Sequence, residues 1–117
     1  TKDGTPIRDY IHVVDLAEAH LKALQRLLNS ADTNPFEVFN LGSGKGFSVL
    51  EIIKTFEAVS GRPLNYEITS RRPGDVPEMF ASTELAKQVL NWEAVRDLHD
   101  MIQSSWTWEQ NLRNEIK

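Results

Sequence analysis

The sequence predicts a small mixed α/β fold with about four helices and two to three short strands. Two observations lead to this fold class. Apolar residues recur at helical spacing in four segments, each of which begins near a side chain that can cap a helix. Two short segments rich in β-forming residues lie among these helices, bounded by glycine, proline or polar residues.

The first predicted helix covers about residues 16–28. Asp15 is placed to act as its N-cap, and Glu18 three residues later completes the pattern of a capping box. The expected buried face consists of Leu16, Ala19, Ala23, Leu24, Leu27 and Leu28. A polar loop, Asn29–Pro35, is expected to follow.

The middle of the chain predicts a strand, a glycine-rich loop and a second helix. The strand covers Phe36–Leu41, and residues 42–46 read Gly-Ser-Gly-Lys-Gly. Ser48 and Glu51 form a second capping box, which opens a helix over about 49–60. Gly61 and Pro63 are expected to end this helix.

The last part of the chain predicts one more strand and two helices. Apolar and polar residues alternate over 64–68, which is typical of a half-buried strand. Ser82 is placed to cap a short helix over about 83–90, with Leu85, Ala86, Val89 and Leu90 facing inward. Trp92 is expected to fill the loop behind it. Asp97 and Asp100 open the final helix, over about 98–113, buried through Leu98, Met101, Ile102, Trp106 and Leu112.

Length and composition exclude several classes of protein. The 117 residues carry 13 Lys+Arg against 17 Asp+Glu, a net charge of −4, so no basic face for nucleic acid is expected. No apolar run approaches the roughly 20 residues that a membrane span needs. Cysteine is absent, which excludes disulfides and thiolate metal sites and fits a reducing compartment. We therefore expect a cytoplasmic protein with neither nucleic acid nor a membrane as partner.

The chain is also expected to be a piece of a longer protein. It begins Thr-Lys-Asp-Gly, without Met or a signal peptide. In addition, two strands make a poor independent sheet, so partner strands are expected elsewhere.

Two motifs have both a chemical and a structural interpretation. A glycine-rich loop between a strand and a helix can cradle a phosphate, but Gly-x-Gly-x-Gly is also a tight turn, and it is not the GxGxxG dinucleotide fingerprint. Arg71, Arg72 and Asp75 lie on one turn, where they can bind phosphate and sugar hydroxyls or pair with each other. Arg8 and Asp9 can likewise bind such groups or pair with each other.

The remaining candidate chemistry is weak. His12, His20 and His99 lack the spacing of metal ligands, so no metal site is expected. No GxSxG motif for a serine nucleophile occurs.

Three segments together resemble one enzyme family. The run Gly4–His20 is similar to the RDYIHVxDLAxAH signature of UDP-glucose (UDP-galactose) 4-epimerases, which are extended short-chain dehydrogenase/reductases. Phe39–Val49 resembles the family's FNLGxGxGxSV segment, and Arg71–Asp75 resembles its RRxGD loop, followed by Leu90-Asn91-Trp92 for LGW. The resemblance covers essentially the whole chain.

The resemblance implies a small C-terminal mixed α/β substrate domain of an extended Rossmann-fold enzyme. Such enzymes interconvert UDP-galactose and UDP-glucose by transient oxidation at C4 with NAD, which is bound by an N-terminal Rossmann domain. This chain has neither a dinucleotide fingerprint nor the family's Tyr-x-x-x-Lys pair. The resemblance therefore implies that residues 1–117 form a single UDP-sugar-binding domain. This domain holds no catalytic or NAD-binding residue and is expected to be inactive alone. The parent enzyme is expected to be a homodimer.

The resemblance also implies roles for six residues. Arg8 and Arg72 match the arginines that hold the diphosphate, and Asp75 matches the carboxylate that binds the ribose hydroxyls. Tyr10 and Val49 match positions that line the UDP pocket. Met79 matches a position beside the sugar, where a bulky residue is associated with exclusion of N-acetylated hexosamines. On this interpretation the glycine loop only shapes the turn before Val49.

Two alternatives stay open. The parent could be a related UDP-sugar epimerase or decarboxylase, because each single motif is shared with such enzymes. It could also be a non-catalytic nucleotide-sugar-binding module. A Rossmann fingerprint and a Tyr-x-x-x-Lys pair in the preceding coding sequence would indicate an enzyme, and their absence would indicate a module.

Overall fold

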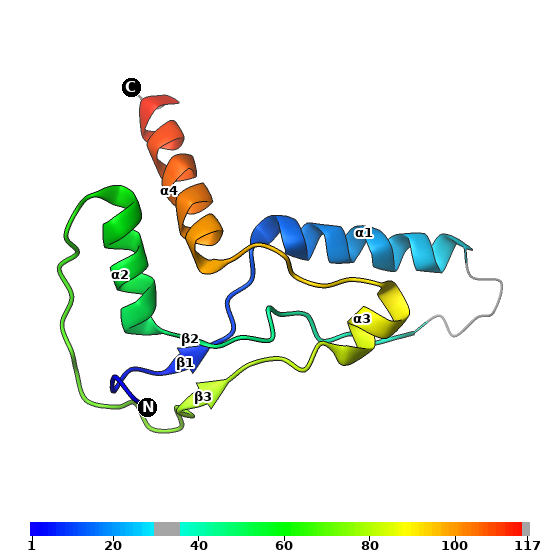
Figure 1. Cartoon of the computed structure of the whole chain (residues 1–117), viewed down its shortest axis with the longest axis horizontal. Coiled ribbons are helices and arrows are strands. Elements are labelled where there is room, and N and C mark those ends of the chain that lie inside the picture. The colour runs from blue at the N-terminus through cyan, green and yellow to red at the C-terminus, as the bar shows by residue number, and fades with distance from the viewer. Residues whose placement is uncertain (30–35, 116–117) are drawn as a thin grey trace.

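The computed structural model describes residues 1–29 and 36–115, which form four helices and one small sheet joined by long extended segments (Figure 1). The helices are α1 (Val13–Asn29), α2 (Val49–Ser60), α3 (Glu84–Leu90) and α4 (Leu98–Glu115). The strands are β1 (Ile7–Arg8), β2 (Phe47–Ser48) and β3 (Glu78–Met79). Helices α2 and α4 pack together, and α1 packs with α3 (Figure 1). The predicted mixed α/β fold class is confirmed.

The sheet has the order β2-β1-β3. Strand β1 is antiparallel to β2, with Arg8 opposite Phe47, and parallel to β3, with Arg8 opposite Met79. Each strand has only two residues. Such short strands have no detectable sequence period, which is why the sequence did not predict these three.

Both predicted strands are wrong. The described residues 36–41 and the segment 64–68 are in neither helix nor strand. Their composition favours strands, but a strand forms only where a neighbour accepts its backbone hydrogen bonds, and no described segment pairs with either. Leu64, Tyr66 and Ile68 are exposed, so the expected half-buried face is wrong as well.

Helix α1 begins two residues earlier than the proposed N-cap. His12 performs the capping, because its Nδ1 accepts a hydrogen bond of 3.0 Å from the N–H of Val14. Asp15 lies inside the helix and is fully buried, and its carboxylate accepts hydrogen bonds from the backbone N–H and the guanidinium of Arg96. A tertiary ion pair therefore replaces the local capping predicted for Asp15.

Helix α2 has the bounds and the caps that the sequence predicts. The Ser48 hydroxyl accepts the N–H of Glu51, and the Glu51 carboxylate accepts the N–H of Ser48. Gly61 ends the helix in the left-handed conformation, at φ 68°, which a residue with a Cβ adopts only with strain.

The two C-terminal helices differ in how well their caps were predicted. Thr83, and not Ser82, is the N-cap of α3, and it makes no side-chain capping bond. Asp97 and Asp100 open α4, as predicted: Asp97 accepts the N–H of Asp100 at 2.9 Å, and Asp100 accepts the N–H of Asp97 at 3.2 Å. The Trp106 ring and the Phe56 ring of α2 pack in a T-shaped arrangement, with centroids 5.4 Å apart.

The buried core lies between α1, α3 and the loop after α3. Trp92 is buried there, as predicted, and its indole N–H donates to the carbonyl of Asp15. The other members of this core are Ala19, Ala86 and Leu90, with Ile11, Ala23, Phe39, Leu41 and Ala94 partly buried around them.

The molecule is flat and leaves much apolar surface uncovered. Its extents are 53 × 41 × 22 Å, and its radius of gyration of 17.7 Å exceeds the roughly 13 Å of a compact domain of this length. Leu24, Leu27 and Leu28 of α1, and Leu85 of α3, are 52–76% exposed, so their prediction as buried residues is wrong for this chain. Leu112 of α4 is also exposed, at 38%.

The predicted loop Asn29–Pro35 lies outside the described residues from position 30 on. Within residues 1–29 and 36–115, none of the helices has the length and the apolar character that crossing a bilayer requires.

Candidate functional site

The sheet brings together three residues that the sequence singles out. Arg8 lies on β1, Met79 lies opposite it on β3, and Val49 is the first residue of α2, directly after β2. Segments up to 71 positions apart in the chain therefore meet at one short sheet. The sheet fixes the backbone of a candidate site to which β1, β3 and the first residue of α2 each contribute one position.

The Arg71–Asp75 turn forms the charged part of the site. Arg72 donates two hydrogen bonds to the Asp75 carboxylate, from Nε at 3.1 Å and from Nη2 at 3.2 Å. The Nη2 of Arg8 lies 3.9 Å from the same carboxylate, and Arg71 donates to the backbone carbonyl of Asp75. Three arginines from two segments thus surround one aspartate.

The electrostatics keep Asp75 ionised. The hydrogen bonds from Arg72 lower the pKa of the Asp75 carboxyl, and the charges of Arg72, Arg8 and Arg71 act in the same direction against partial desolvation. The Arg72 side chain itself is 83% exposed. The guanidinium groups therefore outnumber the carboxylate, so the turn has a net positive charge and can bind an anion.

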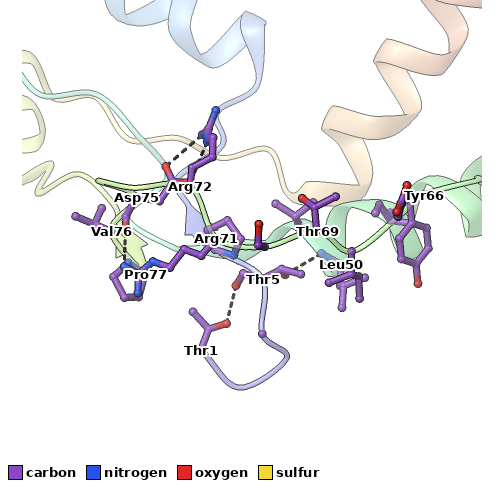
Figure 2. A pocket seen from close by; sticks show the side chains of 17 residues that line it. Thr1, Thr5, Leu50, Tyr66, Thr69, Arg71, Arg72, Asp75, Val76 and Pro77 are labelled. Atoms are coloured by element: carbon purple, nitrogen blue, oxygen red, sulfur yellow. Dashed lines mark hydrogen bonds and ion pairs between the residues drawn. The ribbon is translucent and has the colours of Figure 1, made fainter.

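A cavity of about 470 Å³ lies beside this turn. Figure 2 shows Arg72 and Asp75 linked at one end of it, with Leu50 and Tyr66 toward the other. Its lining residues are Thr1, Gly4–Pro6, Val49, Leu50, Ile53, Tyr66–Arg72 and Asp75–Pro77. The α2 residues and Tyr66 give an apolar wall next to a cationic end. This combination suits a ligand that has a flat ring and an anionic group.

The six predicted site residues are only partly brought together. Val49, Arg72 and Asp75 line the cavity, and Arg8 reaches its edge through Asp75. Tyr10 and Met79 do not line it: Tyr10 is half-buried between β1 and α1, and the Met79 side chain is 58% exposed.

Thr5 and Tyr66 also line the cavity. Thr5 was not singled out, although its hydroxyl accepts the N–H of Leu50 and so joins the segment before β1 to α2. Tyr66 was predicted to be part of a strand. The available signal in the sequence was an aromatic residue five positions before Arg71.

The glycine loop is a structural turn in this fold. The N–H groups of Ser43 and Gly44 donate to the Asp9 carboxylate, at 2.8 and 3.2 Å. The first N–H groups of α2 also donate within the protein, to the Pro6 carbonyl, the Thr5 hydroxyl and the Ser48 hydroxyl. Because these donors already have acceptors within the protein, the loop does not fit the pyrophosphate of a dinucleotide.

Asp97, His99 and Asp100 place possible ligand atoms within 4.8 Å of one another. All three residues are exposed, and the two carboxylates cap α4. Capping accounts for this cluster.

Comparison with known proteins confirms the resemblance. Residues 1–42 match the model of the NAD dependent epimerase/dehydratase family. A UDP-glucose 4-epimerase of Bacillus subtilis is 51% identical over all of this chain, which covers 34% of that protein. The chain thus spans about a third of the length of the curated relatives that it matches.

Two solved structures share the fold. A UDP-glucose 4-epimerase from Bifidobacterium longum in complex with NAD⁺ and UDP has a TM-score of 0.84 and 43% identity, with 97% of this chain and 33% of that chain covered. A UDP-glucose 4-epimerase from Stenotrophomonas maltophila, with bound NAD and formylated UDP-arabinopyranose, has a TM-score of 0.87 and 42% identity, with 98% and 33% covered. The chain is therefore similar in sequence and fold to one part of these enzymes.

Proposed function

We propose that this chain is the UDP-sugar-binding part of a UDP-glucose 4-epimerase, in which the catalytic and NAD-binding residues lie outside residues 1–117. One observation carries the proposal: Arg8, Arg72 and Asp75 converge beside a partly apolar cavity. The relatives that share this part of the chain are 4-epimerases, and one of the solved relatives contains UDP.

The site suits the chemistry of a nucleoside diphosphate. A diphosphate carries about two negative charges and accepts hydrogen bonds from forked guanidinium donors, so we assign it to Arg8 and Arg72. Asp75 is held ionised and acceptor-only, which suits it to the ribose hydroxyls. Val49 and Tyr10 are assigned to the walls around the nucleotide, and Met79 is assigned to the sugar.

These residues bind and orient the substrate. They do not transfer a proton or a hydride. When bound, NAD supplies the reversible oxidation of the sugar, and we assign its site to another part of the polypeptide, because the glycine loop here is closed by its own hydrogen bonds. This chain binds the UDP group firmly, while the hexose stays free to rotate.

The shape of the chain supports a larger protein around it. A single UDP-sugar-binding domain over 1–117 that packs against an NAD-binding domain would cover the exposed leucines of α1. It would also supply neighbours for the extended segments 36–41 and 64–68. The roughly threefold greater length of the relatives leaves room for such a domain.

Two alternatives differ in what the full-length protein does. A related UDP-sugar epimerase or decarboxylase would share the residues that bind the diphosphate. The relatives at 51% and 47% identity are UDP-glucose 4-epimerases, which favours 4-epimerase activity. A non-catalytic module would bind UDP-sugars without turnover.

The deciding experiment incubates the full-length protein and NAD with UDP-galactose, and follows UDP-glucose by proton NMR of the anomeric signals. Interconversion of the two sugars is expected. UDP binding without turnover would indicate the module, and turnover of UDP-glucuronate or UDP-xylose alone would indicate the related enzyme. The 117-residue chain with added NAD is expected to be inactive. Measurable interconversion by it would contradict the proposal that the catalytic and NAD-binding residues lie outside residues 1–117.

A further inference from the structure

The carboxylate of Asp9, directly after β1, gathers donors from two distant segments. Its Oδ1 accepts hydrogen bonds from the N–H and the hydroxyl of Ser43, at 2.8 and 2.7 Å. Its Oδ2 accepts the N–H of Gly44 at 3.2 Å and the N–H of Ala81 at 3.1 Å. All four partners are donors, so the site requires an acceptor-only group.

The glycine loop is shaped around this carboxylate. A Cβ at Gly42 would lie 2.3 Å from Oδ2 of Asp9 and 2.9 Å from Cβ of Ala81, which is closer than real atoms approach. Gly44 has φ 68°, in the left-handed region, and it donates to the same carboxylate. Gly42 therefore leaves room for the Asp9 carboxylate, and the Gly44 N–H donates to that carboxylate and not to an external phosphate.

The sheet depends on this junction because its strands are short. Two-residue strands share few ladder hydrogen bonds. Those that join β1 to the β3 segment include the bonds from Ile7 N–H to the Pro77 carbonyl and from Asp9 N–H to the Met79 carbonyl, at 2.9 and 3.1 Å. The Asp9 side chain adds one bond to the residues after β3 and three to the loop before β2.

We infer that Asp9 is a positioning residue of the UDP-sugar site, through the four-donor junction that joins β1, the glycine loop and Ala81. It fixes Arg8, its neighbour in the chain, against Met79 and against the loop that leads to Val49. Asp9 itself is not assigned a contact with the ligand. The inference rests on the proposed function, because it concerns the geometry of that site.

The test uses Asp9→Asn in the full-length protein. Asparagine keeps the size of the side chain, but its amide group turns N–H donors toward the N–H donors of the loop and of Ala81. Asp97→Asn is the matched control, because Asp97 also accepts a backbone N–H but lies at the start of α4. Ser43→Ala is a milder second variant, which removes one hydroxyl donor and leaves every backbone donor in place.

The readout is the Kd for UDP by calorimetry, at a temperature where circular dichroism shows each variant folded, together with KM and kcat for UDP-galactose. Asp9→Asn should weaken UDP binding by about tenfold or more, with a parallel rise in KM, because a displaced Arg8 would lose a hydrogen bond to the charged diphosphate. Ser43→Ala should change Kd in the same direction by a few-fold, and Asp97→Asn should leave it within about twofold.

A folded Asp9→Asn protein that binds UDP within about twofold of wild type would overturn the inference, since a merely structural role lowers the melting temperature without changing Kd. If Asp9→Asn does not fold, Ser43→Ala decides, and an unchanged Kd in that variant would overturn the inference. Failure of the wild-type protein to bind UDP would contradict the proposed function itself, and no variant is needed to detect that.

Discussion

The indole N–H of Trp92 donates a hydrogen bond of 2.9 Å to the backbone carbonyl of Asp15, 77 positions earlier in the chain. The same aspartate is fully buried, and its carboxylate accepts the backbone N–H of Arg96 at 3.0 Å and the Arg96 guanidinium at 2.5 Å. One turn of α1 is therefore joined by three hydrogen bonds to the segment between α3 and α4.

The first prediction concerns that buried carboxylate. Asp15→Asn should lower the free energy of unfolding by about 1–3 kcal/mol, because it removes the charge that accepts two part-buried hydrogen bonds from Arg96. Glu18→Gln is the control: Glu18 lies 3.6 Å from the Arg96 guanidinium on the exposed surface, so its change should cost less than about 1 kcal/mol. Urea unfolding of the full-length protein, followed by tryptophan fluorescence, measures both. Equal losses in the two variants would contradict the central role of Asp15.

The second prediction separates the two arginines of the turn. Arg72→Ala should weaken UDP binding by roughly 1.5–3 kcal/mol, since Arg72 is assigned to the diphosphate and is held in place by its two hydrogen bonds to Asp75. Arg71→Ala should have a smaller effect, because Arg71 contacts the Asp75 backbone and is not assigned a ligand contact. Calorimetric titration of both variants with UDP provides the comparison, and equal affinities would refute the assignment.

The third prediction concerns substrate range. Met79 is an exposed, flexible side chain on β3, opposite Arg8, and it offers no hydroxyl for orienting a sugar. The full-length enzyme should act best on UDP-galactose and UDP-glucose, with detectable turnover of UDP-N-acetylgalactosamine. Met79→Tyr should selectively suppress the N-acetyl activity. The ratio of kcat/KM for the two kinds of sugar tests this, and an unchanged ratio would show that Met79 does not gate the site.

The fourth prediction follows from the pKa of Asp3. A hydrogen bond from the Ser48 hydroxyl, followed by those from Thr5, lowers the pKa of the Asp3 carboxyl from 3.8 to about 2. Because the folded-state pKa is the lower one, the stabilisation is fully present above pH 3.8 and is lost as the pH falls toward about 2. The melting temperatures of wild type and Asp3→Asn should therefore differ at pH 6 and converge only as the pH falls below about 2. A constant difference would contradict this role for Asp3.

Several parts of the fold that depend on neighbouring residues were predictable from the sequence. The capping box of Ser48 and Glu51, the stop at Gly61 and the start of α4 at Asp97 and Asp100 all act within four residues and are confirmed, whereas the local cap predicted at Ser82 is wrong. The ion pair of Arg72 with Asp75 belongs to the same class, because both partners lie on one turn.

The parts that depend on distant residues were not predictable in this way. Asp15 matched a local capping pattern, but Arg96, 81 positions away, offers it a charged partner in the core. The segments 36–41 and 64–68 have strand composition, yet the described chain supplies no strand beside them. The four donors around Asp9 come from positions 34 to 72 residues away, so no sequence window contains them.

The central claim is that Arg8, Arg72 and Asp75 bind the UDP group of a UDP-sugar. A crystal structure of the full-length protein with UDP tests it most directly. We predict that diphosphate oxygens lie within hydrogen-bonding distance of the Arg8 and Arg72 guanidinium groups and that the Asp75 carboxylate faces the ribose hydroxyls. UDP bound with its diphosphate out of reach of both arginines would contradict this account.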